Sequence, residues 1–237
     1  MEERGPISLS NMNKKIQLKA VRQDGKIIRY IKNPTEAVQI EAVRDDGCVI
    51  QYIKNPSEAV QIEAVRKYAY SIKYISNPSE QVKLEAVREN GHAIQHINNP
   101  SEEVQLEAVR QNGYAIGYID NPSEEVQLAA VRENGTSIRY IKNPTEQVQL
   151  ESIRQDGYNI KFINNPSDYI KSIIDVLETT HRKVYVLHEP NKELLFSIGC
   201  QKNITKEYLI WRIYNLDGGL KEHPYRQEYL DVIERYY

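Results

Sequence analysis

The dipeptide Asn-Pro recurs at a constant spacing of 22 residues, and no other feature constrains the fold of this chain as strongly. It occurs at residues 33–34, 55–56, 77–78, 99–100, 121–122, 143–144 and 165–166. One period earlier, the segment beginning at Asn11 has the same pattern, so seven units fill residues 11–164 without insertion or deletion. A fixed period of this length is typical of a solenoid, in which each unit buries its apolar face against its neighbours.

The unit reads N-P-[ST]-E-x-V-Q-[LI]-E-A-V-R-x-[DN]-G-x-x-I-x-Y-I-x, and its punctuation is helical. We number its positions 1 to 22 from the Asn. Asn suits an N-cap, Pro the first helical position, and Asp-Gly or Asn-Gly a left-handed C-cap. We therefore expect two short helices per unit, of about eleven and about seven residues, folded back on each other.

A leucine-rich repeat is the alternative architecture, because its period also covers 22 residues and V-Q-I-E-A could alternate as a strand. Pro-Ser-Glu before the run and Glu-Ala-Val-Arg after it favour a helix, and the L-x-x-L-x-L-x-x-N spacing is absent. On a helical wheel Val38, Ile40, Ala42 and Val43 span more than half the circumference. Such a helix must be covered on several sides, so we predict an α-solenoid.

Runs such as NPSEEVQLAAVRENG and NPSEAVQIEAVR resemble a family of helical repeats classified only as a domain of unknown function, found in giant viruses, phages and some bacteria. The resemblance covers residues 11 to about 170. It implies a helical fold and a viral setting, with a role against a host protein, and brings no activity. FSIGCQKNITKEYLIWRI, at residues 196–213, resembles a small module that follows repeat arrays in phage and giant-virus proteins, although its Trp211 stands later than usual.

The pattern changes after residue 164. DYIKSIIDVLETT has no Gly stop, so we expect a longer capping helix over residues 165–180. KVYVLHE and ELLFSIGC flank Pro190-Asn191-Lys192 and predict a β-hairpin, followed by helices from about Thr205 and Pro224. The organisation is then a tail (1–10), seven repeats (11–164), the capping helix (165–180) and a small α+β domain of ββαα type (181–237).

Two polar columns recur along the repeats. Position 12 is always Arg: Arg22, Arg44, Arg66, Arg88, Arg110, Arg132 and Arg154. These arginines either form a phosphate- or acid-binding row, or pair structurally with the Glu three residues earlier in the same helix. Position 7 is Gln in six units, Gln17, Gln39, Gln61, Gln105, Gln127 and Gln149, and Lys83 in the remaining one. Because this position lies within the apolar arc, we expect each amide to bond to a neighbouring repeat's backbone.

Aromatic residues concentrate at positions 16 and 20, and the chain has 17 Tyr against 2 Phe. Treating the second helix as an α-helix puts these positions on one face, so we predict a partner-binding stripe in which position 16 makes the main contacts. The alternative is that the position 20 ring packs between second helices. His92 and His96 have a spacing that suits metal binding, but no third ligand is indicated and no metal is expected. The stripe comprises Tyr52, Tyr70, Tyr74, His92, His96, Tyr114, Tyr118, Tyr140 and Tyr158.

Composition argues against several function classes. The formal charge is −2, mean hydropathy is −0.62, and no stretch or N-terminal segment reads as a membrane helix or a secretory signal. We expect a cytoplasmic protein, in the host cytoplasm if it is viral. No nucleotide or hydrolase motif is present, and no cofactor is expected. Cys200 with His181, His188 and His223 is the one combination from which a Cys-dependent enzyme could be built.

Charge is uneven along the repeats. Residues 11–76 hold 12 Lys and Arg against 7 Asp and Glu, whereas residues 77–142 hold 6 against 10. We predict a non-enzymatic scaffold for a protein partner. Nucleic-acid binding is the less favoured alternative, through Lys14, Lys15, Lys19, Lys26, Arg29 and Lys32 with Tyr30. An antiparallel homodimer is a further prediction, through the opposite charges of the two halves or through YLDVIERYY at residues 229–237.

The third repeat departs from the pattern, because Tyr68-Ala69 replaces the Asn-Gly or Asp-Gly stop. If that stop is a left-handed cap, a residue with a Cβ is unfavourable there. We therefore expect an irregularity at residues 68–71, close to where the charge changes sign, and a specific contact at that place.

Overall fold

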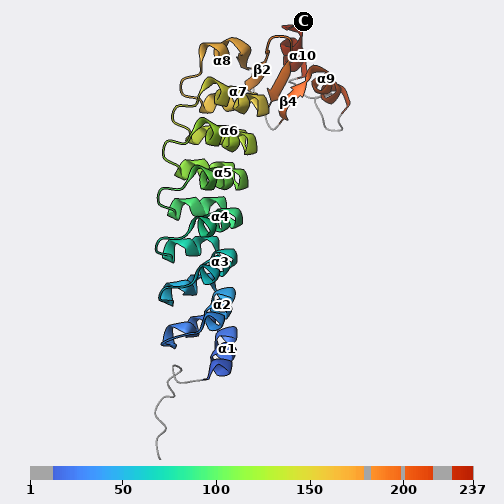
Figure 1. Cartoon of the computed structure of the whole chain (residues 1–237). Helices are drawn as coiled ribbons and strands as arrows, with labels where there is room; N and C mark the ends of the chain where they lie inside the picture. Colours follow the sequence, from blue (N-terminus) through green and yellow to red (C-terminus); the bar gives the residue numbers. More distant parts are fainter. Residues whose placement is uncertain (1–12, 179–182, 199–200, 216–225, 237) are drawn as a thin grey trace, which may run out of the picture. The chain divides into compact units, whose positions relative to one another are not determined.

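In the computed structural model the described residues are 13–178, 183–198, 201–215 and 226–236. The chain divides into two compact units, residues 1–126 and 127–237, which are considered separately here. Helices α1 to α8 and strands β1 to β4 follow one another in chain order, and α9 and α10 end the described chain (Figure 1). The predicted architecture of a helical repeat array followed by a small α+β domain is confirmed.

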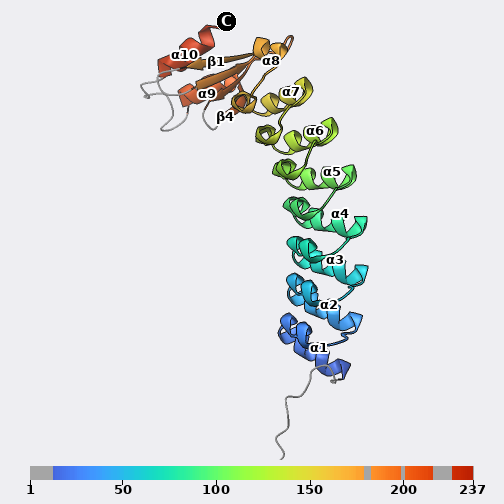
Figure 2. The same cartoon turned by 90° about the vertical axis from the view of Figure 1, so that its left-hand side faces the viewer.

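Each repeat consists of an α-helix of 10 residues and a 3-10 helix of 6 (Figure 2). The second helix is thus a 3-10 helix, with three residues per turn, and not an α-helix. The α-helices are α1 (Lys14–Gln23), α2 (Glu36–Asp45), α3 (Glu58–Lys67), α4 (Glu80–Glu89), α5 (Glu102–Gln111), α6 (Glu124–Glu133) and α7 (Glu146–Gln155). The 3-10 helices are η2 (Gly25–Tyr30), η3 (Gly47–Tyr52), η4 (Ala69–Tyr74), η5 (Gly91–His96), η6 (Gly113–Tyr118), η7 (Gly135–Tyr140) and η8 (Gly157–Phe162).

Stacking of neighbouring repeats buries the predicted apolar arc. Val at positions 6 and 11 and Ala at position 10 have no exposed surface in the second to fifth repeats, as at Val38, Val43 and Ala42. The isoleucines at positions 18 and 21, such as Ile50 and Ile53, complete this core. Helices α1 to α4 each contact the next helix in the series. Burial between repeats, rather than within one, therefore holds the array together.

The Asn-Pro dipeptide does not cap the α-helix as predicted. Each helix begins at the Glu of position 4, and the residue before it is the N-cap; Ser101 Oγ, for example, accepts from the Val104 N–H at 3.3 Å. The Asn instead adopts left-handed backbone, with φ between 47° and 52° at Asn55, Asn77, Asn99 and Asn121. Asn tolerates this conformation better than most residues with a side chain. It turns the chain from one repeat into the next.

The glycine of position 15 serves close approach and not a left-handed cap, and in the third repeat Ala69 takes the same position, buried, with η4 in register. The residue before it is extended, with φ −140° and ψ 109° at Asp46, and the Asp46 carboxylate caps the 3-10 helix by accepting from the Cys48 N–H at 2.9 Å. A Cβ on Gly47 would lie 2.4 Å from the carbonyl oxygen of Ala64 in the next repeat. The glycine thus lets the following α-helix pack against the backbone.

The irregularity predicted at residues 68–71 is absent. Tyr68 has φ −155° and ψ 104°, close to the −159° and 113° of Asn90, and η4 begins at Ala69 in register with the other 3-10 helices. Because the cap is extended, it does not require glycine. The difference lies in the side chain: Tyr68 makes no capping bond and contacts the ring of Tyr70 at 5.5 Å.

The capping helix predicted over residues 165–180 is wrong. Helix α8 (Asp168–Ile173) ends early, and the chain continues as strand β1 (Ile174–Glu178), whose Val176 pairs with Tyr185. β2 (Lys183–Leu187), β3 (Leu195–Ile198) and β4 (Gln201–Thr205) complete an antiparallel sheet in the order β1-β2-β3-β4. The predicted hairpin and the two helices, α9 (Lys206–Asn215) and α10 (Arg226–Glu234), are confirmed.

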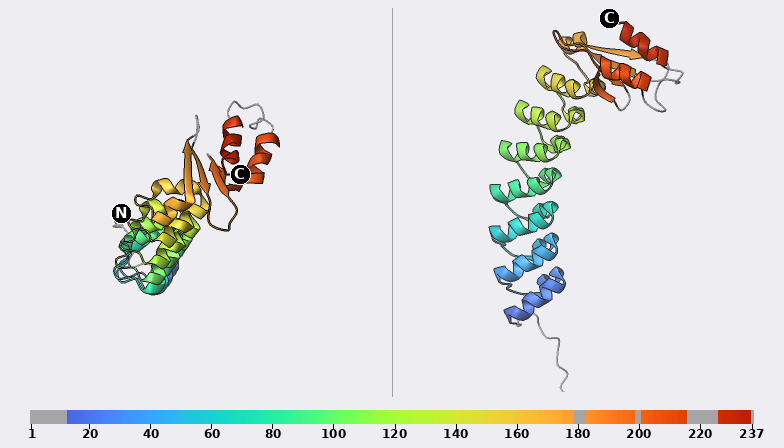
Figure 3. Two further views of the ribbon diagram at one scale, coloured as in Figure 1. Left: turned by 90° about the horizontal axis from the view of Figure 1, so that it is seen from above. Right: turned by 90° about the vertical axis from the view of Figure 1, so that its right-hand side faces the viewer.

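The two faces of the sheet have different neighbours. Val184, Val186, Phe196 and Ile198 form a core with residues of α9 and α10, and both helices lie on that side (Figure 3, left). The alternate residues Tyr185 and Ser197 face η8, where a Cβ on Gly157 would lie 3.1 Å from the Tyr185 Cβ. Tyr229 and Ile233 are buried in this core, so YLDVIERYY does not form the predicted dimer surface.

Side chains of the sheet domain repeat the bonds that one repeat makes to the previous one. The Gln155 amide donates to the carbonyls of Val131 and Arg132, and its oxygen accepts from the Gly135 N–H at 2.7 Å. Asn203 of the sheet domain bonds to the equivalent backbone groups 22 residues further on. Its amide donates to the carbonyls of Ile153 and Arg154, and its oxygen accepts from the Gly157 N–H at 3.0 Å.

Arg154 completes the match by pairing with Glu189, which Lys192 also contacts. The sheet is therefore the cap of the repeats, in place of the predicted helix.

We expect Gly91→Ala to destabilise the fold by about 1–3 kcal/mol, because its Cβ would meet the Ala108 carbonyl oxygen at 2.3 Å. Urea unfolding followed by circular dichroism measures the change. Gly117→Ala, at an exposed position of η6, is the matched control and should be neutral or slightly stabilising. Equal stability of the two variants would contradict the packing role of the glycine.

We expect Glu189 to make the cap sensitive to acid. Its hydrogen bond with Arg154 is the main reason that the pKa of Glu189 is lowered to about 2 from an ordinary 4.5. A carboxylate with a depressed pKa stabilises the fold above its unfolded pKa, and that contribution, about 3 kcal/mol here, disappears as the pH falls from about 5 to 2.

Unfolding free energies of the wild type and of Glu189→Gln, measured across this range, should differ at pH 6 and converge at pH 2. Glu41→Gln, in a more exposed pair with Arg22, is the control and should cost less than about 1 kcal/mol. A constant difference between the wild type and Glu189→Gln would count against the assignment.

Candidate interaction surface

Tyrosines at position 20 form the exposed aromatic row of the repeats. In a 3-10 helix the isoleucines at positions 18 and 21 point to the core, so positions 19 and 20 between them point outwards. We call the surface formed by positions 16, 19, 20 and 22 the 3-10 face. Its position 20 tyrosines have large exposed fractions: Tyr30 58%, Tyr52 42%, Tyr74 38% and Tyr118 50% in the first unit, and Tyr140 50% in the second.

Side chains at position 16 point in a different direction from those at position 20, so the two positions do not form a single stripe. With three residues per turn the two side chains are separated by about 120° around the helix axis. Tyr70, His92 and Tyr114 are half-buried, and the rings of Tyr70 and His92 each contact the position 20 ring of the next repeat, at 5.5 Å. Tyr158 is 38% exposed and meets Tyr185 of β2 edge-on.

His92 and His96 do not share a ligand position. The His96 ring contacts Tyr70 in the third repeat, and the His92 ring contacts Tyr118 in the fifth. Burial, followed by the nearby Lys73 ammonium, lowers the pKa of His96. Among the described residues no group of three or more His, Cys, Asp or Glu could hold a metal ion.

The arginine column pairs with the next repeat rather than within its own helix. Arg22, Arg44, Arg66 and Arg88 each bond to the Glu 19 residues later, at 2.9, 2.6, 2.5 and 3.0 Å, and Arg132 approaches Glu151 at 3.8 Å. The predicted pairing three residues apart occurs in addition at Arg66 and Glu63, 3.6 Å apart. Arg110 has no ion pair among the described residues, and its sequence register explains why: position 9 of the following repeat is Ala129.

The glutamine column also bonds differently from the prediction. The side-chain amides of Gln39, Gln61, Gln105 and Gln149 donate to the Pro carbonyl five residues earlier in the same repeat, at 2.9 to 3.0 Å. The expected bond to the next repeat exists at Gln149, whose oxygen accepts from the Ser167 N–H. Gln127 occupies the same position of α6 and is half-buried.

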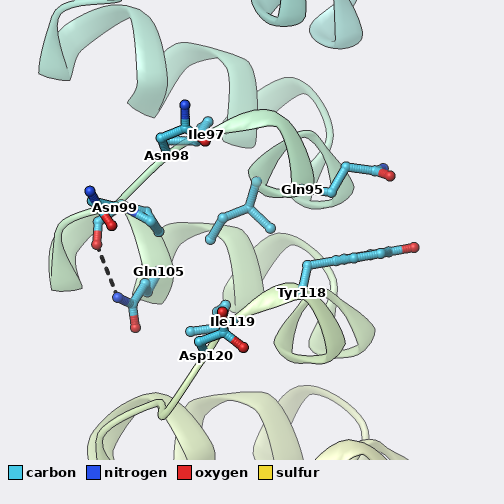
Figure 4. A pocket seen from close by; sticks show the side chains of 10 residues that line it. Gln95, Ile97, Asn98, Asn99, Gln105, Tyr118, Ile119 and Asp120 are labelled. Carbon is cyan, nitrogen blue, oxygen red and sulfur yellow. Dashed lines mark hydrogen bonds between the residues drawn. The ribbon is translucent and has the colours of Figure 1, made fainter.

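A polar groove of about 630 Å³ opens between the fourth and fifth repeats, beside the row of tyrosines (Figure 4). Tyr118 and Gln95 extend along one end, and Asn98, Asn99 and Asp120 come from the linkers at the other (Figure 4). Gln105, bonded to the Pro100 carbonyl, lies at the linker end, between Asn99 and Asp120 (Figure 4). The groove is lined by Ile94, Gln95, Ile97, Asn98, Asn99, Pro100, Gln105, Tyr118, Ile119 and Asp120.

Cations without acidic partners stand next to the exposed tyrosines. Arg29 lies over the ring of Tyr30 at 4.6 Å and Lys73 over that of Tyr74 at 4.8 Å. The sequence shows the excess of positive charge in residues 11–76 but not its gathering on one face. Positions 19 and 22, read as columns, would have revealed it. Over the described part of the first unit, no ion pair involves Lys26, Arg29, Lys32, Lys54 or Lys73.

The predicted cysteine site cannot be built from the structure. Cys200, His181 and His223 lie outside the described residues. His188 follows β2, and its Nε2 lies 3.5 Å from the carboxylate of Asp175. None of the described helices is long and apolar enough to span a bilayer.

Comparisons with protein-family models, curated proteins and solved structures find no match to the chain. The resemblance to the helical repeats of giant viruses and phages therefore stays a prediction. The geometry of the surface is what supports a function.

We expect Arg66→Ala to destabilise the array more than Arg110→Ala, because it leaves the half-buried Glu85 carboxylate without its partner. Arg110→Ala, at the same position of α5, should stay within about 0.5 kcal/mol of the wild type. Chemical denaturation of both variants tests this difference, and an equal loss in the two would show that the pairing between repeats is not the cause.

Proposed function

We propose that this protein is a non-enzymatic scaffold that binds a protein partner through the tyrosines of the 3-10 face. The observation that carries the proposal is the half-exposed tyrosine at the same position of successive repeats. The core does not require an aromatic ring there, because the neighbouring isoleucines already fill it. Tyrosine offers a large contact area with few rotatable bonds and a hydroxyl that bonds to polar groups, which favours it at protein interfaces.

The setting of the partner is part of the proposal. The resemblance to viral repeats supports a role in the host cytoplasm, in which the scaffold binds and neutralises a host protein. The main contacts are then the exposed tyrosines at position 20 of the repeats. They are Tyr30, Tyr52, Tyr74 and Tyr118 in the first unit and Tyr140 in the second. The half-buried ring of His92 contacts that of Tyr118 from the previous repeat, at 5.5 Å, and so supports one of these tyrosines.

Nucleic-acid binding is the second candidate, favoured by the unpaired Arg29 over the ring of Tyr30. Lys26, Arg29 and Lys32 belong to η2 and its linker, whereas Lys14, Lys15 and Lys19 belong to α1. A phosphate backbone would meet Asp120 further along the same face. Binding to nucleic acid should weaken steeply between about 50 and 200 mM salt, which separates it from a tyrosine-based protein contact.

Affinity capture from nuclease-treated lysate of the host, with the triple variant Tyr52→Ala, Tyr74→Ala and Tyr118→Ala, tests the proposal. We expect recovery of the partner to fall by about tenfold or more, because each lost ring at an interface centre costs at least about 1 kcal/mol. Tyr169→Ala with Tyr208→Ala, exposed on α8 and α9, is the control and should leave recovery unchanged. Undiminished recovery by the triple variant would exclude the 3-10 face as the binding surface.

A further inference from the structure

The 3-10 face and the α-helices of the first five repeats differ in how their charges are compensated. On the α-helices the arginines Arg22, Arg44, Arg66 and Arg88 are bonded to glutamates of the next repeat. Positions 16 to 22 of these five repeats contain five cations and a single acid, Asp120. Because none of the five cations, Lys26, Arg29, Lys32, Lys54 and Lys73, takes part in a described ion pair, their charge is available to a ligand.

Within the first five repeats the cations are confined to one end of the face. They belong to the first three repeats, whereas the corresponding positions of the fourth and fifth repeats are Gln95, Asn98, Gly117 and Asp120. A ligand that follows these five repeats therefore meets positive charge at one end and uncharged or acidic groups at the other. A uniform polyanion fits only the first part of this surface.

Amides distinguish a polypeptide from a nucleic acid at the second part. The groove between the fourth and fifth repeats presents the side chains of Gln95, Asn98 and Asn99 as well as that of Tyr118. An amide side chain both donates and accepts, which matches the N–H and C=O groups of an extended peptide backbone. A phosphate backbone offers acceptors alone, and Asp120 would repel it.

The repeat spacing suits an extended chain. Packed helices lie about 8–10 Å apart, so each repeat advances the row of tyrosines by about that distance. A polypeptide in polyproline II conformation rises about 3.1 Å per residue, so three residues cover about 9 Å and the same side of the chain returns at each repeat. A segment of about 15 residues would span the five repeats.

We propose that the partner contributes an extended segment that lies along the 3-10 face, with its acidic half on the first three repeats and its uncharged half in the groove between the fourth and fifth. This inference rests on the proposed protein-binding function and specifies the chemistry and the register of the ligand. Lys54 and Lys73 hold the acidic half, and Tyr52, Tyr74 and Tyr118 contact the turns of the segment that lie on the second, third and fifth repeats.

Selection of random 16-residue peptides displayed on phage, with the full-length protein as bait, tests the inference. We expect enriched sequences with Asp and Glu gathered in one half and few charges in the other. Binding of a synthetic copy of an enriched peptide should weaken by about tenfold in Lys54→Glu with Lys73→Glu. Lys19→Glu with Lys67→Glu makes the same change of charge on exposed positions of α1 and α3 and should leave the affinity within about twofold.

Two results would overturn the inference. One is selection that enriches no peptide, or peptides without the one-sided acidic bias. The other is a 20-nucleotide oligothymidine that binds as tightly as the peptide and loses its affinity in the same lysine variants, which would assign the face to nucleic acid. The proposed function fails separately, through unchanged partner capture by the tyrosine variant, so a neutral segment that still requires Tyr52, Tyr74 and Tyr118 would reject only the acidic ligand.

Discussion

The close approach of position 15 of one repeat, a glycine in six of the seven repeats, to the helix backbone of the next sets the geometry on which the other interactions depend. With no side chain at Gly47, the carbonyl of Ala64 approaches to a distance that a Cβ would not allow. This spacing brings Arg44 within bonding distance of Glu63, and the Ser57 hydroxyl within reach of Glu36. Both pairs join successive repeats, so they stabilise the array only when the backbones are already close.

The sheet domain ends the array by supplying the same partners from a different fold. Asn203 has left-handed backbone, with φ 40°, and its amide donates to the carbonyl of Ile153. This carbonyl is equivalent to that of Val131, to which Gln155 donates one repeat earlier. Ser197 adds a second acceptor for the Gly157 N–H, and Glu189 takes the place of the next repeat's glutamate. The β-sheet can therefore bond to the exposed backbone groups of the last helical repeat, because its side chains offer the same donors and acceptors as a further repeat would. It does not need the same secondary structure.

The period of the sequence was enough to predict helical repeats and their buried residues, since Val38, Ala42 and Val43 recur at helical spacing. It did not reveal the 3-10 helix, although Gly47, Ile50 and Ile53 are spaced by three, the period of that helix. The glutamate with which Arg44 pairs depends on how far one repeat is displaced from the next. This displacement cannot be predicted from the sequence of a single unit. Strand β1 was missed because Ile174 to Leu177 acquire their conformation by pairing with β2.

The third repeat shows which positions are free to vary for binding. Tyr68, Ala69 and Lys67 all break the pattern there, yet η4 starts and ends in register with the other 3-10 helices. Since packing by the neighbouring repeats fixes the backbone, local departures leave the fold intact. The same independence holds at positions 19 and 22, where the repeats place cations, amides, a glycine and an aspartate on one regular surface. The side chains at positions 19 and 22 can thus vary from repeat to repeat, and with them the binding preference of the 3-10 face, with little loss of stability.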